Sequence, residues 1–105
     1  MATRFHRIDY HVHDILMEAD RQRGMTPYEL AKAARISFVL LFGPIDRLQD
    51  GGFIEMRWQG ERWPNGDAPN DEGLTSLPGE RHSLYRITSR AKQTLVARIQ
   101  SKRES

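Results

Sequence analysis

The sequence predicts a single α+β domain built from short helices and a two-stranded hairpin. Two adjacent stretches, residues 26–34 and 37–50, each begin with a capping residue and then carry apolar residues at helical spacing. Residues 53–59 and 82–88 have strand character, and a long segment rich in turn residues separates them. A chain of 105 residues has room for one hydrophobic core, so we treat residues 1–105 as one domain.

Composition excludes several classes of protein. The chain has no cysteine, which rules out a structural disulfide and a thiolate zinc site and suits a reducing compartment. The longest apolar run, residues 38–42, is far too short to cross a bilayer. The net charge of +2 permits nucleic-acid binding without indicating it. We therefore expect a cytoplasmic protein that does not enter a membrane.

The amino-terminal part predicts an arm and a helix. Residues 1–7 are polar and basic, as in a flexible arm, and residues 8–23 carry an apolar stripe that includes Val12, Ile15 and Leu16. Gly24 is placed to end that helix. Histidines and aspartates also gather here, but His11 and His13 are two residues apart and point to different faces of a helix. Solvated or packed histidines are thus favoured over a metal site, and we expect none.

The next two helices have well-marked ends. Thr26 and Glu29 have the spacing of a capping box, with Pro27 at the first helical position. Ser37 can cap the second helix, in which Leu41, Ile45 and Leu48 form the inward face, and Gly51-Gly52 stops it. Pro44 lies inside this helix and is expected to kink it or delay its regular part, because proline lacks an N–H group.

The hairpin is predicted from alternation. Ile54, Met56 and Trp58 fall on one face of the first strand and Glu55 and Arg57 on the other, which indicates one buried and one solvated side. Leu84 and Tyr85 of the second strand are expected to pair against Met56 and Trp58. Residues 60–80 between the strands form a long loop, and Thr88 or Ser89 can cap a basic helix over residues 89–103.

Two short helices joined by a turn, followed by a hairpin, outline a winged helix-turn-helix. Four segments stand at characteristic positions in register: Tyr28-Glu29-Leu30-Ala31, Arg47-Leu48, Gly52-Phe53-Ile54 and Tyr85-Arg86-Ile87-Thr88. As a set, over roughly residues 10–100, they resemble the PadR-type winged-helix transcriptional regulators and, more loosely, the MarR group.

The resemblance implies a bacterial repressor or regulator that binds double-stranded operator DNA as a homodimer. Residues 37–50 would be its recognition helix, and the terminal helices would form the dimer. On that basis the expected DNA-binding residues are Lys32, Arg35, Ser37, Phe38, Arg47, Arg57, Arg62, Arg81 and Arg86. The expected dimer residues are Ile15, Leu95 and Ile99.

Three features depart from the family pattern. The recognition helix begins with apolar Phe38, Val39 and Leu40, which can touch thymine methyls but cannot make hydrogen bonds to bases. Pro44 lies within it, and the loop carries Asp67, Asp71, Glu61, Glu72 and Glu80 against Arg62 alone. An acidic wing would be repelled by phosphate. The alternative function is therefore a protein-interaction module that uses the apolar helix as a partner surface.

An enzyme is not expected, because the chain has no nucleophile–base signature and no glycine-rich phosphate loop. No cofactor is implied. A small-molecule effector is an open question: Trp58, Trp63 and Tyr85 could line a pocket, although aromatic residues beside a hairpin more often belong to the core.

Overall fold

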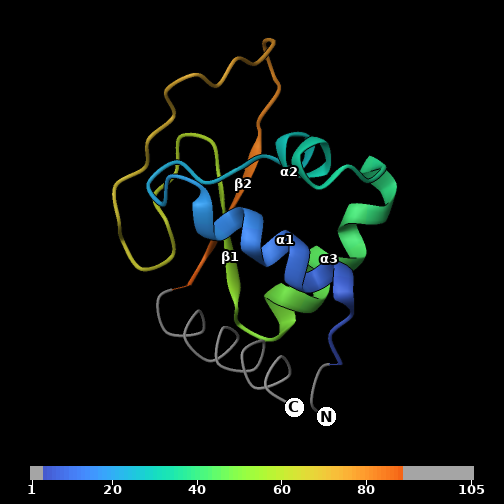
Figure 1. Cartoon of the computed structure of the whole chain (residues 1–105). Helices are drawn as coiled ribbons and strands as arrows, with labels where there is room; N and C mark the ends of the chain where they lie inside the picture. Colours follow the sequence, from blue (N-terminus) through green and yellow to red (C-terminus); the bar gives the residue numbers. More distant parts are fainter. Residues whose placement is uncertain (1–3, 89–105) are drawn as a thin grey trace.

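The computed structural model describes residues 4–88, which form three helices followed by a hairpin (Figure 1). The helices are α1 (Arg7–Glu18), α2 (Pro27–Ala34) and α3 (Phe38–Asp50), and the strands are β1 (Ile54–Trp58) and β2 (Ser83–Ile87). The predicted α+β class is confirmed at this level, and the order of elements is compatible with a winged helix. The helix predicted for residues 89–103 lies outside the described residues.

The first helix is shorter than predicted. It ends at Glu18 because Ala19 adopts an extended conformation (φ −81°, ψ 154°), so the expected continuation to residue 23 is wrong. Residues 20–23 instead lie in a turn segment after the helix. Backbone carbonyl groups of this turn accept hydrogen bonds from side chains of the hairpin and of the loop between the strands.

The predicted ends of α2 and α3 are confirmed. Thr26 Oγ1 accepts a hydrogen bond from the N–H of Glu29 (3.2 Å), and Glu29 Oε1 accepts one from the N–H of Thr26 (2.9 Å). Ser37 Oγ accepts a bond from the N–H of Leu40 (3.4 Å) at the start of α3. The helix continues past Pro44, which is buried inside it.

The main core lies between the helices and one face of the hairpin. Figure 1 shows α1 crossing in front of the strands, with α2 and α3 on its other sides, and α1 contacts α2, α3 and β2. The most deeply buried apolar side chains of this core come from all five elements: Val12, Leu16, Leu30, Leu41, Ile45, Leu48, Ile54 and Ile87.

The strands pair in antiparallel fashion, with Ile54 opposite Ile87 and Met56 opposite Tyr85. The expected pairing of Met56 with the Leu84–Tyr85 region is therefore confirmed, whereas Trp58 lies opposite Ser83. The prediction of a solvated second face is wrong, because Arg57 on that face is only 2% exposed. The long loop between the strands covers this face.

Within residues 4–88, none of the helices is long and apolar enough to cross a membrane.

Candidate nucleic-acid interface

Local bonds hold both ends of α2. Arg23 makes a bidentate ion pair with Glu29 in the first turn of α2, at 2.8 and 3.0 Å. Burial opposes ionisation of Glu29, but its hydrogen bonds with Arg23 and Thr26 outweigh that effect and lower the pKa of its carboxyl. At the other end of α2, the N–H of Ile36 donates to the carbonyl of Ala31 (3.1 Å). Both ends of α2, the first helix of the pair, are thus fixed by local bonds.

Arg35 ends α2 in an unusual conformation. Its backbone is left-handed (φ 57°, ψ 43°), and it is the only residue other than glycine with a positive φ in the described part of the chain. Its N–H bonds to the carbonyls of Ala31 and Lys32, in a position where glycine is normally preferred. The arginine side chain is exposed.

The first turn of α3 presents apolar side chains to solvent. Val39 is 79% exposed and Leu40 67% exposed. Phe38 stacks on Tyr28 of α2 with ring centroids 4.4 Å apart, and Phe42 meets Phe38 edge-on at 5.0 Å. We call this surface the α2–α3 face, and it comprises Tyr28, Lys32, Arg35, Ser37, Phe38, Val39, Leu40 and Phe42.

Two of the predicted DNA-binding cations lie on this face. Lys32 and Arg35 are both exposed, and within residues 4–88 neither forms an ion pair. Ser37 is also exposed, with its hydroxyl oxygen accepting the capping bond. Phe38 is half-buried and packed against other rings, so it supports the face more than it forms its outer surface.

Arg47 is placed differently from the prediction. Its Nε and Nη2 donate to the two carboxylate oxygens of Asp9 on α1, at 2.7 and 2.8 Å. Asp9 is fully buried and also accepts a hydrogen bond from the N–H of His6 (2.8 Å). The hydrogen bonds with Asp9 raise the pKa of Arg47 above its usual value. This guanidinium joins α1 to α3, whereas the sequence analysis expected it to contact phosphate.

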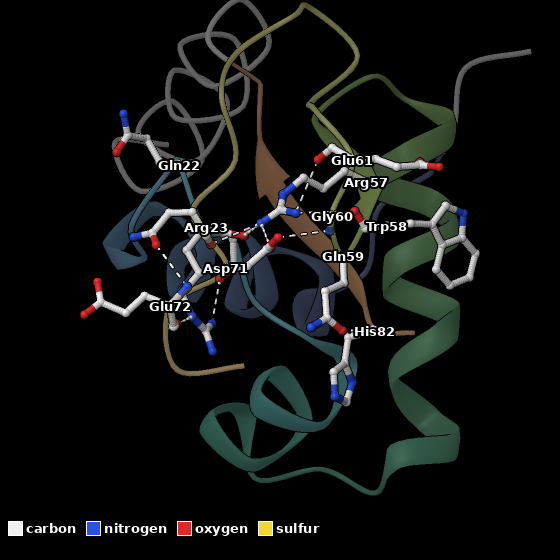
Figure 2. A network of polar contacts seen from close by, with 12 residues as sticks. Gln22, Arg23, Arg57, Trp58, Gln59, Gly60, Glu61, Asp71, Glu72 and His82 are labelled. Atoms are coloured by element: carbon white, nitrogen blue, oxygen red, sulfur yellow. Dashed lines mark hydrogen bonds and ion pairs between the residues drawn. The ribbon is translucent and has the colours of Figure 1, made fainter. Parts of the chain in front are cut away.

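Arg57 is buried at the centre of a polar network (Figure 2). Its Nη2 lies 2.8 Å from Asp71 Oδ1 and donates to the carbonyls of Arg23 (3.2 Å) and Asn70 (3.1 Å). Asp71 Oδ2 in turn accepts a hydrogen bond from the N–H of Gly60 (2.9 Å). Arg57 therefore ties the loop to the turn that follows α1.

Arg86 performs a similar task on β2. It is 2% exposed, pairs with Glu55 (2.6 Å) and Asp67 (3.0 Å), and donates to the carbonyl of Arg21 (3.1 Å). The hydrogen bonds from Asn65 and Arg86 lower the pKa of Asp67. Arg57 and Arg86 are thus buried and paired with internal carboxylates, whereas the sequence analysis expected both at the DNA surface.

Trp63 lies between these two arginines. Its ring centroid is 5.1 Å from the Arg57 guanidinium carbon and 4.3 Å from that of Arg86, and its Nε1 donates to the carbonyl of Gln22 (2.8 Å). Gly24 permits this approach, since a Cβ there would lie 2.8 Å from the Trp63 ring and from the carbonyl oxygen of Tyr85. The tryptophan is buried against the second face of the hairpin, which agrees with the core position favoured from the sequence, whereas its contacts with the two arginines were not predicted.

Arg62 and Arg81 lie on the surface of the loop region. Arg62 donates to the carbonyl of Gly66 (3.0 Å), and Arg81 pairs with Glu61 (3.1 Å) over the ring of Trp58. With Asp67 and Asp71 held by buried arginines and Glu61 by Arg81, three of the loop carboxylates are already neutralised. The acidity of the loop is therefore weaker than its composition suggested.

The dimer residue predicted on α1 is not part of the α2–α3 face. Ile15 on α1 is half-buried and borders two shallow surface depressions, one shared with His11 and Asp14 and the other with Arg23 and Met25. Leu95 and Ile99 lie outside the described residues. His13 is buried against Phe53, and residues 4–88 contain no group of three or more side chains arranged to bind a metal.

The aromatic residues considered for an effector pocket do not share one cavity wall. Trp63 and Tyr85 are buried, and burial raises the pKa of the Tyr85 hydroxyl, whereas Trp58 faces solvent beneath Arg81.

Comparisons with protein families, with curated proteins and with solved structures find no match to this chain.

Proposed function

We propose that this chain is a small cytoplasmic DNA-binding transcription regulator, a repressor in the manner of the PadR-type winged-helix proteins that its motifs resemble. In this proposal α2 and α3 are the helix-turn-helix, β1 and β2 are the wing, and a homodimer binds double-stranded DNA. The first turn of α3 enters the major groove, where helix-turn-helix proteins read base edges.

The observation that carries the proposal is the placement of Lys32 and Arg35. These two exposed cations lie at the end of α2, directly before α3 in the chain, and form no ion pair within residues 4–88, whereas Arg47, Arg57 and Arg86 are held by internal carboxylates. Phosphate contacts position a protein on the duplex, and exposed unpaired cations beside the reading helix provide them. Arg62 and Arg81 on the wing are secondary candidates for the same role.

A salt titration tests this proposal. Fluorescence anisotropy of a labelled mixed-sequence duplex is recorded for the full chain at about 50 and about 200 mM salt, a range over which phosphate contacts change affinity steeply. We expect Lys32→Ala with Arg35→Ala to weaken binding and to reduce the salt slope by roughly 0.9 for each phosphate that is no longer neutralised.

Arg21→Ala is the matched control. It removes one positive charge, where the double variant removes two, from the turn after α1, which lies on the opposite side of the molecule from the α2–α3 turn (Figure 1). Its salt slope should equal that of the unmodified protein. Absence of binding to any duplex up to about 100 μM protein, the weak limit of non-specific DNA affinity, would refute the proposal.

The second candidate function is a protein-interaction module on the same fold. The exposed Val39, Leu40 and Phe42 favour it, because contiguous apolar surface marks protein interfaces. The duplex titration distinguishes the two functions, because an interaction module would not show a salt-dependent affinity for DNA that depends on Lys32 and Arg35.

A further inference from the structure

The exposed side chains in the first turn of α3 offer few kinds of interaction. Val39 and Leu40 are its most exposed side chains and carry only methyl and methylene groups. The hydroxyl of Ser37 accepts the capping bond from the N–H of Leu40, and the hydroxyl of Tyr28 belongs to α2 and not to this turn. A helix that reads bases through this turn therefore has very few hydrogen-bonding groups with which to do so.

This apolar surface is held in place from below. The Tyr28 ring stacks on Phe38 with an interplanar angle of 12°, and Phe42 packs edge-on against Phe38. Leu41, the remaining residue of the turn, is fully buried in the core. Val39 and Leu40 are thus presented on a supported helix end, and the main core does not need them.

The positive charges beside this apolar surface indicate the kind of molecule that binds it. Lys32 and Arg35 are exposed at the end of α2, which directly precedes α3, and their positive charges complement a polyanion. In the major groove of DNA, the apolar group that a base presents is the C5-methyl of thymine. An apolar surface with a cationic border matches a methyl-rich groove between two phosphate strands.

We propose that Val39 and Leu40 recognise C5-methyl groups in the major groove, so that the protein prefers thymine-rich duplex sites. The proposal rests on the DNA-binding function above and specifies what that site reads. Lys32 and Arg35 position the helix without regard to sequence, and the two aliphatic side chains supply the preference.

The test compares duplexes that differ only in the methyl group. A duplex of A·T pairs is titrated against the same duplex with deoxyuridine in place of thymidine, which keeps the pairing and removes the methyls. We expect tighter binding to the thymine duplex, by about four-fold for each methyl that is buried on binding. A G·C duplex with 5-methylcytosine should likewise bind better than its unmethylated form.

The variants separate the roles of the residues. Val39→Ser with Leu40→Ser should abolish the methyl preference and leave the salt slope unchanged, and Lys32→Ala with Arg35→Ala should weaken both duplexes equally. Leu77→Ser is the matched control, since Leu77 is 73% exposed at the tip of the loop. It should keep the full preference.

Two failures are distinguishable. Equal, salt-dependent affinity for thymine and deoxyuridine duplexes would overturn the methyl proposal and leave DNA binding standing. Lack of binding to every duplex would overturn both and would identify the apolar turn as a protein-binding surface. Because Val39 and Leu40 are exposed, their serine variants should fold, and a thermal melt verifies this.

Discussion

At the scale of single residues, Arg35 is held in a backbone conformation that suits glycine better. A left-handed conformation costs an ordinary residue about 1–2 kcal/mol, whereas glycine adopts it freely. A strained residue that is retained at an exposed turn is a candidate for a functional side chain. Arg35 has that combination, since its φ is 57° and its side chain faces solvent.

Arg35→Gly should therefore separate folding from binding. We expect the free energy of unfolding to stay constant or rise by up to about 1 kcal/mol, because strain is relieved while unfolded-state entropy increases. DNA affinity should fall, because the variant has no guanidinium to neutralise a phosphate. Urea unfolding and anisotropy on the same preparation measure both quantities. A variant that loses stability, or that binds DNA as well as the original, would contradict this role of Arg35.

Arg47, in contrast to Arg35, is expected to stabilise the fold and not to contact DNA. Arg47→Ala leaves the carboxylate of Asp9 buried without its cation, and we expect a loss of about 2–4 kcal/mol in unfolding free energy. This loss is smaller than that expected for a fully enclosed pair because 29% of the Arg47 side chain is exposed. DNA affinity per folded molecule should not change.

A double-mutant cycle with Asp9→Ala checks this interpretation. The two substitutions should couple by about 0.5–3 kcal/mol, as residues in direct contact do. Additive effects, or a loss of DNA affinity with unchanged stability, would return Arg47 to the DNA-binding set.

Sequence patterns could not distinguish the buried arginines from the exposed ones. Arg57 and Arg62 are both arginines in or beside the hairpin, yet one is buried against Asp71 and the other is exposed. The difference depends on partners many positions away, such as Asp9 for Arg47. Spacing rules detect only contacts between residues about one helical turn apart or residues paired across neighbouring strands.

At the scale of elements, local chemistry was sufficient for the ends of α2 and α3 but failed for the end of α1 and for the loop. The capping residues Thr26 and Ser37 marked α2 and α3 correctly because a cap bonds within its own first turn. Trp63 donates a hydrogen bond to Gln22, which is far away in the sequence, so no local pattern could predict this contact. A lone tryptophan within a polar, turn-rich segment was the available indication that the loop is anchored.

The loop should accordingly behave as two parts. Trp63→Ala empties the second face of the hairpin, and we expect it to cost about 3–5 kcal/mol of unfolding free energy. Leu77→Ala at the exposed tip should change stability by no more than about 0.5 kcal/mol. Urea denaturation of both variants makes the comparison. Similar effects from the two substitutions would mean that the anchored half does not stabilise the hairpin.

At the scale of the whole molecule, the hairpin is covered on both faces, by the helices on one side and by the loop on the other. Within residues 4–88, the α2–α3 face and one side of α1 remain exposed for contacts with other molecules. On α1, Ile15 and Met17 are half-buried beside shallow depressions that also include His11 and Glu18. A small domain gains stability when such a surface is buried against a second copy.

Ile15→Glu should therefore convert the proposed homodimer to a monomer, because an isologous contact meets the new charge twice across its symmetry axis. Sedimentation velocity at micromolar concentration measures the change, and a far-ultraviolet circular dichroism spectrum shows whether the variant is folded. Leu77→Glu makes the same apolar-to-acid change at the loop tip and should remain dimeric. A dimeric Ile15→Glu protein would move the interface away from α1, and a monomeric unmodified protein would remove the dimer. In the monomeric case each α3 would bind DNA alone, and palindromic sites would hold no advantage over single half-sites.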